Sequence, residues 1–292
     1  MSQRLAPARR VARRLGAAVL ACLLGACAAI DPAPTLELTV ATYNLRLDLL
    51  SDGLDAWPRR RDAVISLIQR HGFDVLGTQE GLAHQIDALA RMPGYQVVGV
   101  GRDDGVRAGE FSAIVYRADR FERLASGDFW LSETPDRPSK GWDARCCNRI
   151  ATWVRLRDRA SRRAFVVLSV HFDHEGTVAR RESARLVSAR LRELAGAEPV
   201  LAIGDFNATP DSEPVALMTL ALRDAHTQSI TPPTGPAGTF NGFRHDAVAA
   251  DRIDYIFVGP GWTVLRHATI DDKSGGRYPS DHLPVAARLR LD

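Results

Sequence analysis

Apolar and polar residues follow two different periods along this chain. Short, mostly apolar runs predict buried strands, and they lie at residues 36–45, 73–78, 95–100, 111–116, 151–156, 164–171, 200–203, 253–258 and 285–291. Segments with apolar side chains at helical spacing lie at residues 58–71, 82–92 and 178–194. Thr177 is expected to cap the last of these helices. The order of elements favours an α/β fold in which two sheets pack face to face with helices outside.

Residues 38–292 are expected to form one domain. About 250 residues suit either one large sandwich or barrel, or two ordinary domains. No linker rich in Pro, Gly or Ser divides this part of the chain, and no internal repeat is visible. One domain is therefore the better interpretation.

Residues 1–26 have the pattern of a secretory signal peptide. Five arginines and no acidic residue precede an apolar run that is too short to span a bilayer. Residues 24–27, Leu-Gly-Ala-Cys, then resemble the bacterial lipobox, in which the cysteine is lipidated and becomes the new first residue. The alternative is an ordinary signal peptide cut near Ala26 or Ala29, with Cys27 incidental.

Lipidation at Cys27 would make the protein an exported lipoprotein that is anchored to a membrane. Residues 27–37 are rich in Ala, Asp and Pro and show no period, so we expect them to form a flexible tether. Ala28 follows the cysteine, and bacterial lipoproteins without Asp at that position usually go to the outer membrane. We expect the domain to face the periplasm or the cell surface from that membrane.

The net charge changes sign if the signal peptide is removed. The whole chain has 38 basic and 35 acidic residues, and the signal peptide holds five of the basic ones. The remainder has 33 basic residues against 35 acidic ones, a net charge of −2 with histidine neutral. Such a chain lacks the basic surface expected of a protein that holds duplex nucleic acid through many phosphates. This weakens a purely nucleolytic interpretation without excluding it.

Cys146 and Cys147 are neighbours in the chain. Adjacent side chains of a strand point to opposite faces, so two adjacent thiols are a poor framework for a disulfide. We expect packing residues or a vicinal disulfide here rather than a metal site.

Eight polar residues lie at or near the ends of predicted strands: Asn44, Glu80, His171, Asp205, Asn207, Asp254, Asp281 and His282. Burying isolated carboxylates costs several kcal/mol unless a cation or hydrogen-bond donors compensate. The set is rich in oxygen and contains no thiolate, which favours Mg²⁺ or Mn²⁺ over a structural zinc. Taken singly, each residue has an ordinary explanation as a turn former, a solvated acid or a helix cap. Their joint order is more specific.

That order resembles the endonuclease/exonuclease/phosphatase superfamily. The resemblance covers the chain from residue 38 onward, and it rests on Asn44, Gln79-Glu80, His171, Gly-Asp-Phe-Asn at 204–207, Ile-Asp-Tyr at 253–255 and Ser-Asp-His at 280–282. Further motifs are similar to a bacterial subgroup related to the deadenylases of the carbon catabolite repressor type; they lie at 129–135, 140–143 and 238–243. The resemblance implies a single-domain, four-layered α/β/β/α sandwich and in-line attack by water on phosphorus.

The resemblance also implies roles for the site residues. Glu80 and Asn44 would be the primary ligands of Mg²⁺ or Mn²⁺, with Asp281 close by. Asp205 would position or deprotonate the attacking water, and Asn207 would orient that water or the phosphate.

The histidines and one arginine complete the implied site. His171 would donate to a non-bridging phosphate oxygen, and His282, with its tautomer fixed by Asp254, would be the second acid/base group. Whether Asp205 or His282 is the general base stays open. Arg149 is a candidate phosphate contact, and a salt-bridged surface arginine is the alternative.

The sequence thus predicts a metal-dependent phosphoester hydrolase, a monomer held at a membrane through Cys27. One interpretation of its substrate is a phosphodiester in nucleic acid, cleaved by a 3′–5′ exonuclease or an endonuclease. A second is the phosphoesters of lipid head groups or small metabolites. The third, a binding protein that has lost the chemistry, is disfavoured because the site residues are intact.

Overall fold

The computed structural model describes residues 1–3 and 35–292, and the domain comprises the second of these ranges. The expected signal peptide, Cys27 and residues 27–34 of the expected tether lie outside the described residues. The first strand already includes Leu36 and Glu37, the last two residues of that tether. Among the described residues, no helix combines the length and the apolar character needed to cross a membrane.

Two six-stranded mixed sheets form the centre of the domain. The first has the spatial order β11 (Trp262–Thr269), β12 (Val285–Leu291), β1 (Leu36–Asn44), β2 (Val75–Gln79), β4 (Ile114–Arg117), β3 (Tyr95–Val98). The second has the order β5 (Phe121–Trp130), β6 (Ile150–Asp158), β7 (Ala164–His171), β8 (Val200–Asp205), β10 (Asp254–Val258), β9 (Arg223–Asp224). Inward-facing apolar residues of both sheets, among them Val40, Ile114, Val167 and Ile203, form the core between them.

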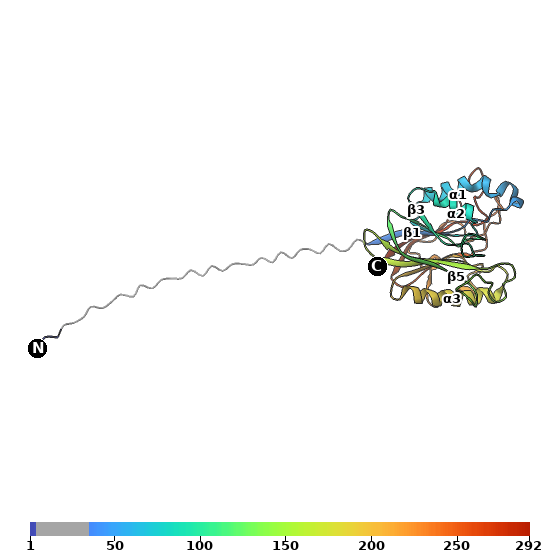
Figure 1. Ribbon diagram of the computed structural model, residues 1–292. Helices are drawn as coiled ribbons and strands as arrows, with labels where there is room; N and C mark the ends of the chain where they lie inside the picture. Colours follow the sequence, from blue (N-terminus) through green and yellow to red (C-terminus); the bar gives the residue numbers. More distant parts are fainter. Residues whose placement is uncertain (4–34) are drawn as a thin grey trace. The chain divides into compact units, whose positions relative to one another are not determined.

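Helices cover the outer face of each sheet. The first sheet packs against α1 (Trp57–His71) and α2 (Ala83–Ala90), and the second packs against α3 (Thr177–Ala195) and α4 (Glu213–Thr219). Figure 1 shows α1 and α2 on one side of the two sheets and α3 on the opposite side. Two short helices, η1 (Leu50–Asp55) and α5 (Ala225–Gln228), lie in connections. The predicted α/β/β/α sandwich is confirmed.

Three strands escape the apolar pattern, β5, β9 and β11. All three lie at the edge of a sheet, β9 has only two residues, and the middle of β5 is polar and partly exposed, so it lacks the apolar run that marks a buried strand. The shorter runs of the inner strands were sufficient to predict them.

The expected cap of α3 is wrong. Gly176 occupies the N-cap position, and it has no side chain to accept from the first turn. Asp143, from the loop before β6, accepts instead from the backbone N–H groups of Val178 and Ala179 at 3.1 Å and 2.6 Å. A carboxylate distant in sequence therefore satisfies the free donors of this helix.

Candidate active site

The first sheet supplies Asn44 and Glu80. The register of the parallel strands β1 and β2 pairs Asn44 with Gln79, so Glu80 follows directly beside Asn44. The side-chain amide of Asn44 donates to Glu80 Oε1 at 2.8 Å and, across the sandwich, to Asp205 Oδ2 at 3.0 Å. Glu80 has a φ of 63°, a left-handed conformation that costs a non-glycine residue about 1–2 kcal/mol. Asn44 thus links the two sheets at the site.

The second sheet supplies three residues around Asp205. Parallel β7 and β8 pair His171 with Asp205, and antiparallel β10 pairs Asp254 with Asp205 from the other side. Asn207 follows with a φ of 47°; its backbone N–H donates to Asp205 Oδ1 at 2.9 Å. Its side-chain amide donates to the carbonyl of Phe172 at 3.0 Å. Asp205 is therefore the centre of this part of the site.

His282 lies between two buried carboxylates. Its Nδ1 is 2.9 Å from Asp254 Oδ2, and its Nε2 is 3.7 Å from Asp205 Oδ2. Burial disfavours the imidazolium, but the charges of Asp254 and Asp205 and the hydrogen bond to Asp254 outweigh it. Together they hold the pKa of His282 well above its usual value. The ring is therefore kept charged inside the protein.

The neighbouring groups titrate away from their usual ranges as well. Burial first, and then the charge of Asp254, raise the pKa of Asp205 to about 7, although His282 opposes this. Burial and the adjacent guanidinium of Arg149 lower the pKa of His171 far below its usual value, so His171 is neutral at pH 7. One neutral and one charged imidazole thus flank Asp205.

The acidic side chains are arranged to fit a divalent cation. Ligand atoms of Glu80, Asp205 and His282 lie within 4.8 Å of one another. Asp281 is buried nearby, which raises the pKa of its carboxyl, and the Arg46 guanidinium lies 3.7 Å from it. Buried carboxylates in such proximity are stabilised by a cation, and their oxygens are the donors that Mg²⁺ and Mn²⁺ prefer. The amide oxygen of Asn44, however, accepts from the backbone N–H of Arg46.

Arg149 is buried rather than on the surface. Its Nε lies 3.3 Å from Asp173 Oδ2, its Nη2 2.6 Å from His174 Nδ1, and its Nη1 3.1 Å from the ring of His171. Its guanidinium is thereby held at the wall of the pocket, beside His171, the side chain expected to donate to a phosphate oxygen.

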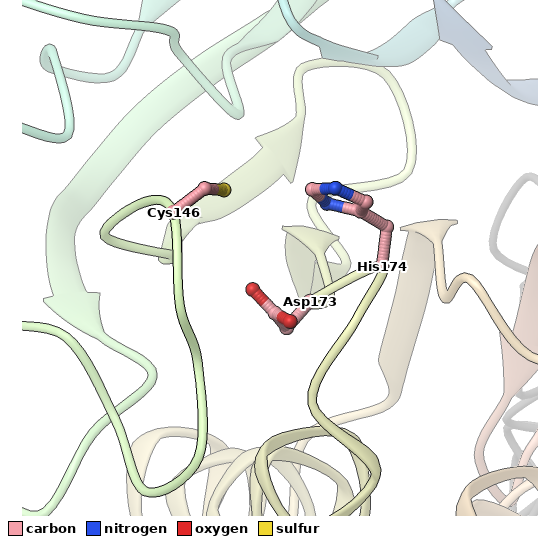
Figure 2. A group of neighbouring side chains, drawn as sticks. All are labelled: Cys146, Asp173 and His174. Carbon is pink, nitrogen blue, oxygen red and sulfur yellow. The ribbon is translucent and has the colours of Figure 1, made fainter.

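A second group of potential metal ligands gathers beside Arg149. Figure 2 shows Cys146 on one segment with its sulfur directed toward Asp173 and His174, which come from another; their ligand atoms lie within 4.8 Å of one another. The sulfur of Cys146 is, however, bonded to Cys147 in a vicinal disulfide, and Arg149 contacts both other residues. We therefore interpret the group as a support for Arg149 and not as a metal centre.

Seven of the predicted site residues line one pocket with a volume of about 320 Å³; they are Glu80, Arg149, His171, Asp205, Asn207, Asp281 and His282. The two others, Asn44 and Asp254, are buried and hold these side chains from behind. The structure thus brings all the predicted catalytic and metal-binding side chains to one place.

Sequence reasoning missed further charged residues of this pocket, among them Arg102 and Glu110. They come from the loop between β3 and β4, and Arg102 Nη1 lies 2.6 Å from Glu110 Oε2. Burial raises the pKa of Glu110 to about 7, although Arg102 opposes it. The signal available was the run Gly101-Arg102-Asp103-Asp104-Gly105, an unusual concentration of charge inside a glycine turn.

Arg60 was also missed, and it fixes the loops that carry the site. From α1 its guanidinium donates to the carbonyls of Arg46 at 2.6 Å and Pro279 at 3.2 Å, and also to that of Leu45. The first loop follows Asn44 and the second precedes Asp281. The buried side chain of Arg60 therefore holds together the two loops that carry the first sheet's site residues.

A four-layered sandwich with an acid-rich pocket at its strand ends, and with an imidazole held by a carboxylate, defines a class of phosphoester hydrolases. The comparison with protein families agrees with this class. The chain belongs to the Endonuclease/Exonuclease/phosphatase family, which it matches over residues 41–282.

Several solved structures resemble the chain over nearly their whole length. An endonuclease/exonuclease/phosphatase family protein of Bacteroides thetaiotaomicron is 39% identical with a TM-score of 0.86, covering 89% of this chain and 97% of that one. The mannosyl-6-phosphatase of Bacteroides thetaiotaomicron is 40% identical with a TM-score of 0.82, covering 86% and 99%. The family and these neighbours are phosphoester hydrolases.

More distant matches add less. The catalytic domain of human nocturnin is 21% identical with a TM-score of 0.68, covering 87% of this chain and 93% of that one, which shows the fold alone. An uncharacterized protein of Acanthamoeba polyphaga mimivirus is 27% identical over 158 residues, and the match spans 52% of this chain and 59% of that protein's length.

Proposed function

We propose that this chain is a Mg²⁺- or Mn²⁺-dependent phosphatase of small phosphoesters, with sugar phosphates as the preferred class. The observation that carries the proposal is the 320 Å³ pocket in which Asp205 lies between a neutral His171 and a charged His282. Similarity to a mannosyl-6-phosphatase supports the substrate class. The chain's near-neutral charge after signal removal gives little support to the nucleic-acid alternative.

Glu80, with Asp281 beside it, would hold the cation, and Asn44 orients Glu80 by donating to its Oε1 at 2.8 Å. When bound, the cation would neutralise charge on the phosphate and on the departing oxygen. Glu80 Oε2 accepts from the backbone N–H of Leu47 at 3.2 Å, which orients the carboxylate. The site residues therefore fit this group.

The chain's own residues would perform the proton transfers. Asp205, with a pKa of about 7, accepts a proton from the attacking water as the new P–O bond forms. The ester P–O bond breaks on the opposite side of phosphorus, and the leaving oxygen takes up a proton from solvent as the alcohol is released. Neutral His171 donates one N–H to a non-bridging oxygen, and Arg149 behind it adds positive charge. The imidazolium of His282 stabilises the negative charge that develops next to Asp205.

We also propose, from the sequence alone, that the protein is exported and anchored through lipid on Cys27. Two or three acyl chains hold a protein stably at a membrane, because each buried methylene contributes about 0.8 kcal/mol. Replacing Cys27 with Ala should release the protein from the membrane fraction. A variant that fractionates like the parent would exclude the cysteine as the anchor.

A phosphoester panel with Mg²⁺ and Mn²⁺ tests the activity. It contains hexose 6-phosphates, inositol phosphates, sphingomyelin and oligonucleotides, and we expect the highest kcat/KM on a hexose 6-phosphate. Asp205→Asn should lower kcat by about 10²–10⁴-fold, the usual cost of losing a general base. Asp158→Asn is the matched control, since Asp158 is a buried carboxylate at the opposite end of β6 from Arg149 and does not line the pocket. Turnover in excess chelator would contradict the metal, and preference for oligonucleotides would favour the nuclease instead.

A further inference from the structure

The loop between β3 and β4 places an ion pair in the wall of the pocket that the proposed mechanism does not use. Arg102 is 8% exposed, and the side chain of Glu110 is 12% exposed. Both line the pocket, and Arg102 Nη1 lies 2.6 Å from Glu110 Oε2. Burying such a pair contributes little to stability by itself, so its presence in the pocket requires another explanation.

This loop holds the pair rigidly. The carbonyl of Arg102 accepts from Trp130 Nε1 at 2.6 Å and from Asn148 Nδ2 at 3.2 Å, and its N–H donates to the carbonyl of Glu110 at 3.0 Å. A Cβ on Gly101 would lie 2.3 Å from the carbonyl oxygen of Ala108, so only glycine allows the loop to fold this tightly. The two charged groups are therefore pre-organised.

The guanidinium of Arg102 is not fully satisfied. Glu110 is its one carboxylate partner among the described residues, and its buried Nε has no hydrogen-bond partner there. An arginine presents five N–H donors, and a carboxylate accepts about four hydrogen bonds. The pair thus retains both donors and acceptors for a ligand in the pocket.

The pair lies at one end of a continuous row of polar groups. His282 Nε2 is 3.7 Å from Asp205, His171 Nε2 is 3.6 Å from Asp205, and His171 Nδ1 is 3.8 Å from Glu110 Oε2. The order along the row is His282, Asp205, His171, Glu110 and Arg102. A substituent of the phosphate that extends past His171, away from His282, therefore meets Glu110 and Arg102.

We propose that Arg102 and Glu110 form the subsite that recognises hydroxyl groups of the sugar in the leaving group. Adjacent hydroxyls donate to a carboxylate and accept from a guanidinium, which is the pairing these two side chains offer. The inference rests on the proposed function and adds the residues that select a polyhydroxylated ester over an apolar one.

Two substrates that differ in their leaving group test the subsite. In the Mg²⁺-loaded full-length protein, Glu110→Gln and Arg102→Lys should each lower kcat/KM for the preferred hexose 6-phosphate about 10–100-fold, because hydrogen bonds to charged groups are lost. The loss for 4-nitrophenyl phosphate, whose leaving group has no hydroxyl to bind, should be at least fivefold smaller, an order-of-magnitude expectation. The ratio between the two substrates is the readout, because a misfolded fraction lowers both rates equally.

A matched control comes from the same loop. Arg107 pairs with Asp87 at 2.7 Å, but both are exposed and outside the pocket, so Arg107→Lys should leave the ratio at the parent value. Equal losses on both substrates in a variant that melts at the parent temperature would assign the pair to phosphate binding or catalysis and overturn the subsite. So would an unchanged hexose phosphate rate. A parent enzyme without activity on hexose phosphates would overturn the proposed function, and the subsite with it.

Discussion

Two buried histidines of this domain, His282 and His267, have different electrostatic surroundings, and their pKa values are shifted in opposite directions. His282, 4% exposed, donates from Nδ1 to Asp254 Oδ2 at 2.9 Å and has Asp205 on its other side, and its pKa is raised. His267 on β11, 2% exposed, has no partner for Nδ1 among the described residues, and burial followed by the charge of His226 lowers its pKa to about 4. Burial is nearly equal, so the carboxylates decide the difference.

This contrast separates a catalytic candidate from a structural residue. The ring of His267 packs edge-on against His226, with centroids 5.0 Å apart, and Asp224 and Arg252 form an ion pair nearby. Asp224 raises the pKa of His267 and Arg252 lowers it, both less than burial does. A neutral histidine there contributes packing, whereas a charged one beside Asp205 is prepared for proton chemistry.

The largest expected effect comes from the same substitution at both positions. His282→Gln should lower kcat by about 10²–10³-fold, because the imidazolium that stabilises charge next to Asp205 is lost, while the amide still donates to Asp254 and preserves the fold. His267→Gln should leave kcat near the parent value but lower the melting temperature, because it buries an unpaired amide. Turnover and thermal unfolding of both variants check this. Equal loss of activity at both positions would contradict the assignment of a catalytic role to His282 and a structural one to His267.

Acid should destabilise the domain through His267. Its pKa is about 4 in the folded protein against an ordinary 6.5, so between these pH values only the unfolded chain binds the proton. Stability is therefore present above pH 6.5 and falls by about 3 kcal/mol as pH drops to 4. The free energy of unfolding can be measured in urea from pH 7 to 4. His267→Phe should remove the part of its decrease that comes from His267. An identical slope in parent and variant would contradict the assignment.

The smallest expected effect distinguishes between the two causes of the low pKa of His267. His226→Phe keeps the edge-on packing but removes a positive charge, so the pKa of His267 should rise while staying below its ordinary value. An NMR titration of the His267 ring measures it. A pKa that returned fully to the ordinary value would show that the charge of His226, and not burial, is the main cause.

Much of the site could be predicted from the sequence, because its residues lie at the ends of strands that the apolar pattern reveals. Parallel neighbours end at the same edge of a sheet, so Asn44 and Glu80, and likewise His171 and Asp205, were predictable as pairs. The meeting of the two pairs required the resemblance to a family as well, because no local pattern specifies how two sheets face each other.

Other features depend on tertiary structure alone. Arg102 and Glu110 become pocket residues only because a loop folds back over the site, and a charged loop is ordinarily on the surface. The cap of α3 comes from Asp143, 34 positions before the helix starts at Thr177, whereas local reasoning chose the nearest hydroxyl. Edge strand β5 is too polar for the apolar pattern to reveal.

The pairing of the first strand with the last has a consequence for the order of folding. Leu36 pairs with Leu291 and Thr42 with Val285, so β1 acquires its neighbour β12 only when nearly the whole chain is available. The strands of the second sheet all lie between residues 121 and 258, so this sheet can form before β12 has been synthesised. Pairings so distant in sequence form slowly, since a long loop must close first. During synthesis, therefore, the part of the pocket built on Asn44 is completed last, and an unfinished chain does not possess the acidic cluster in its final form.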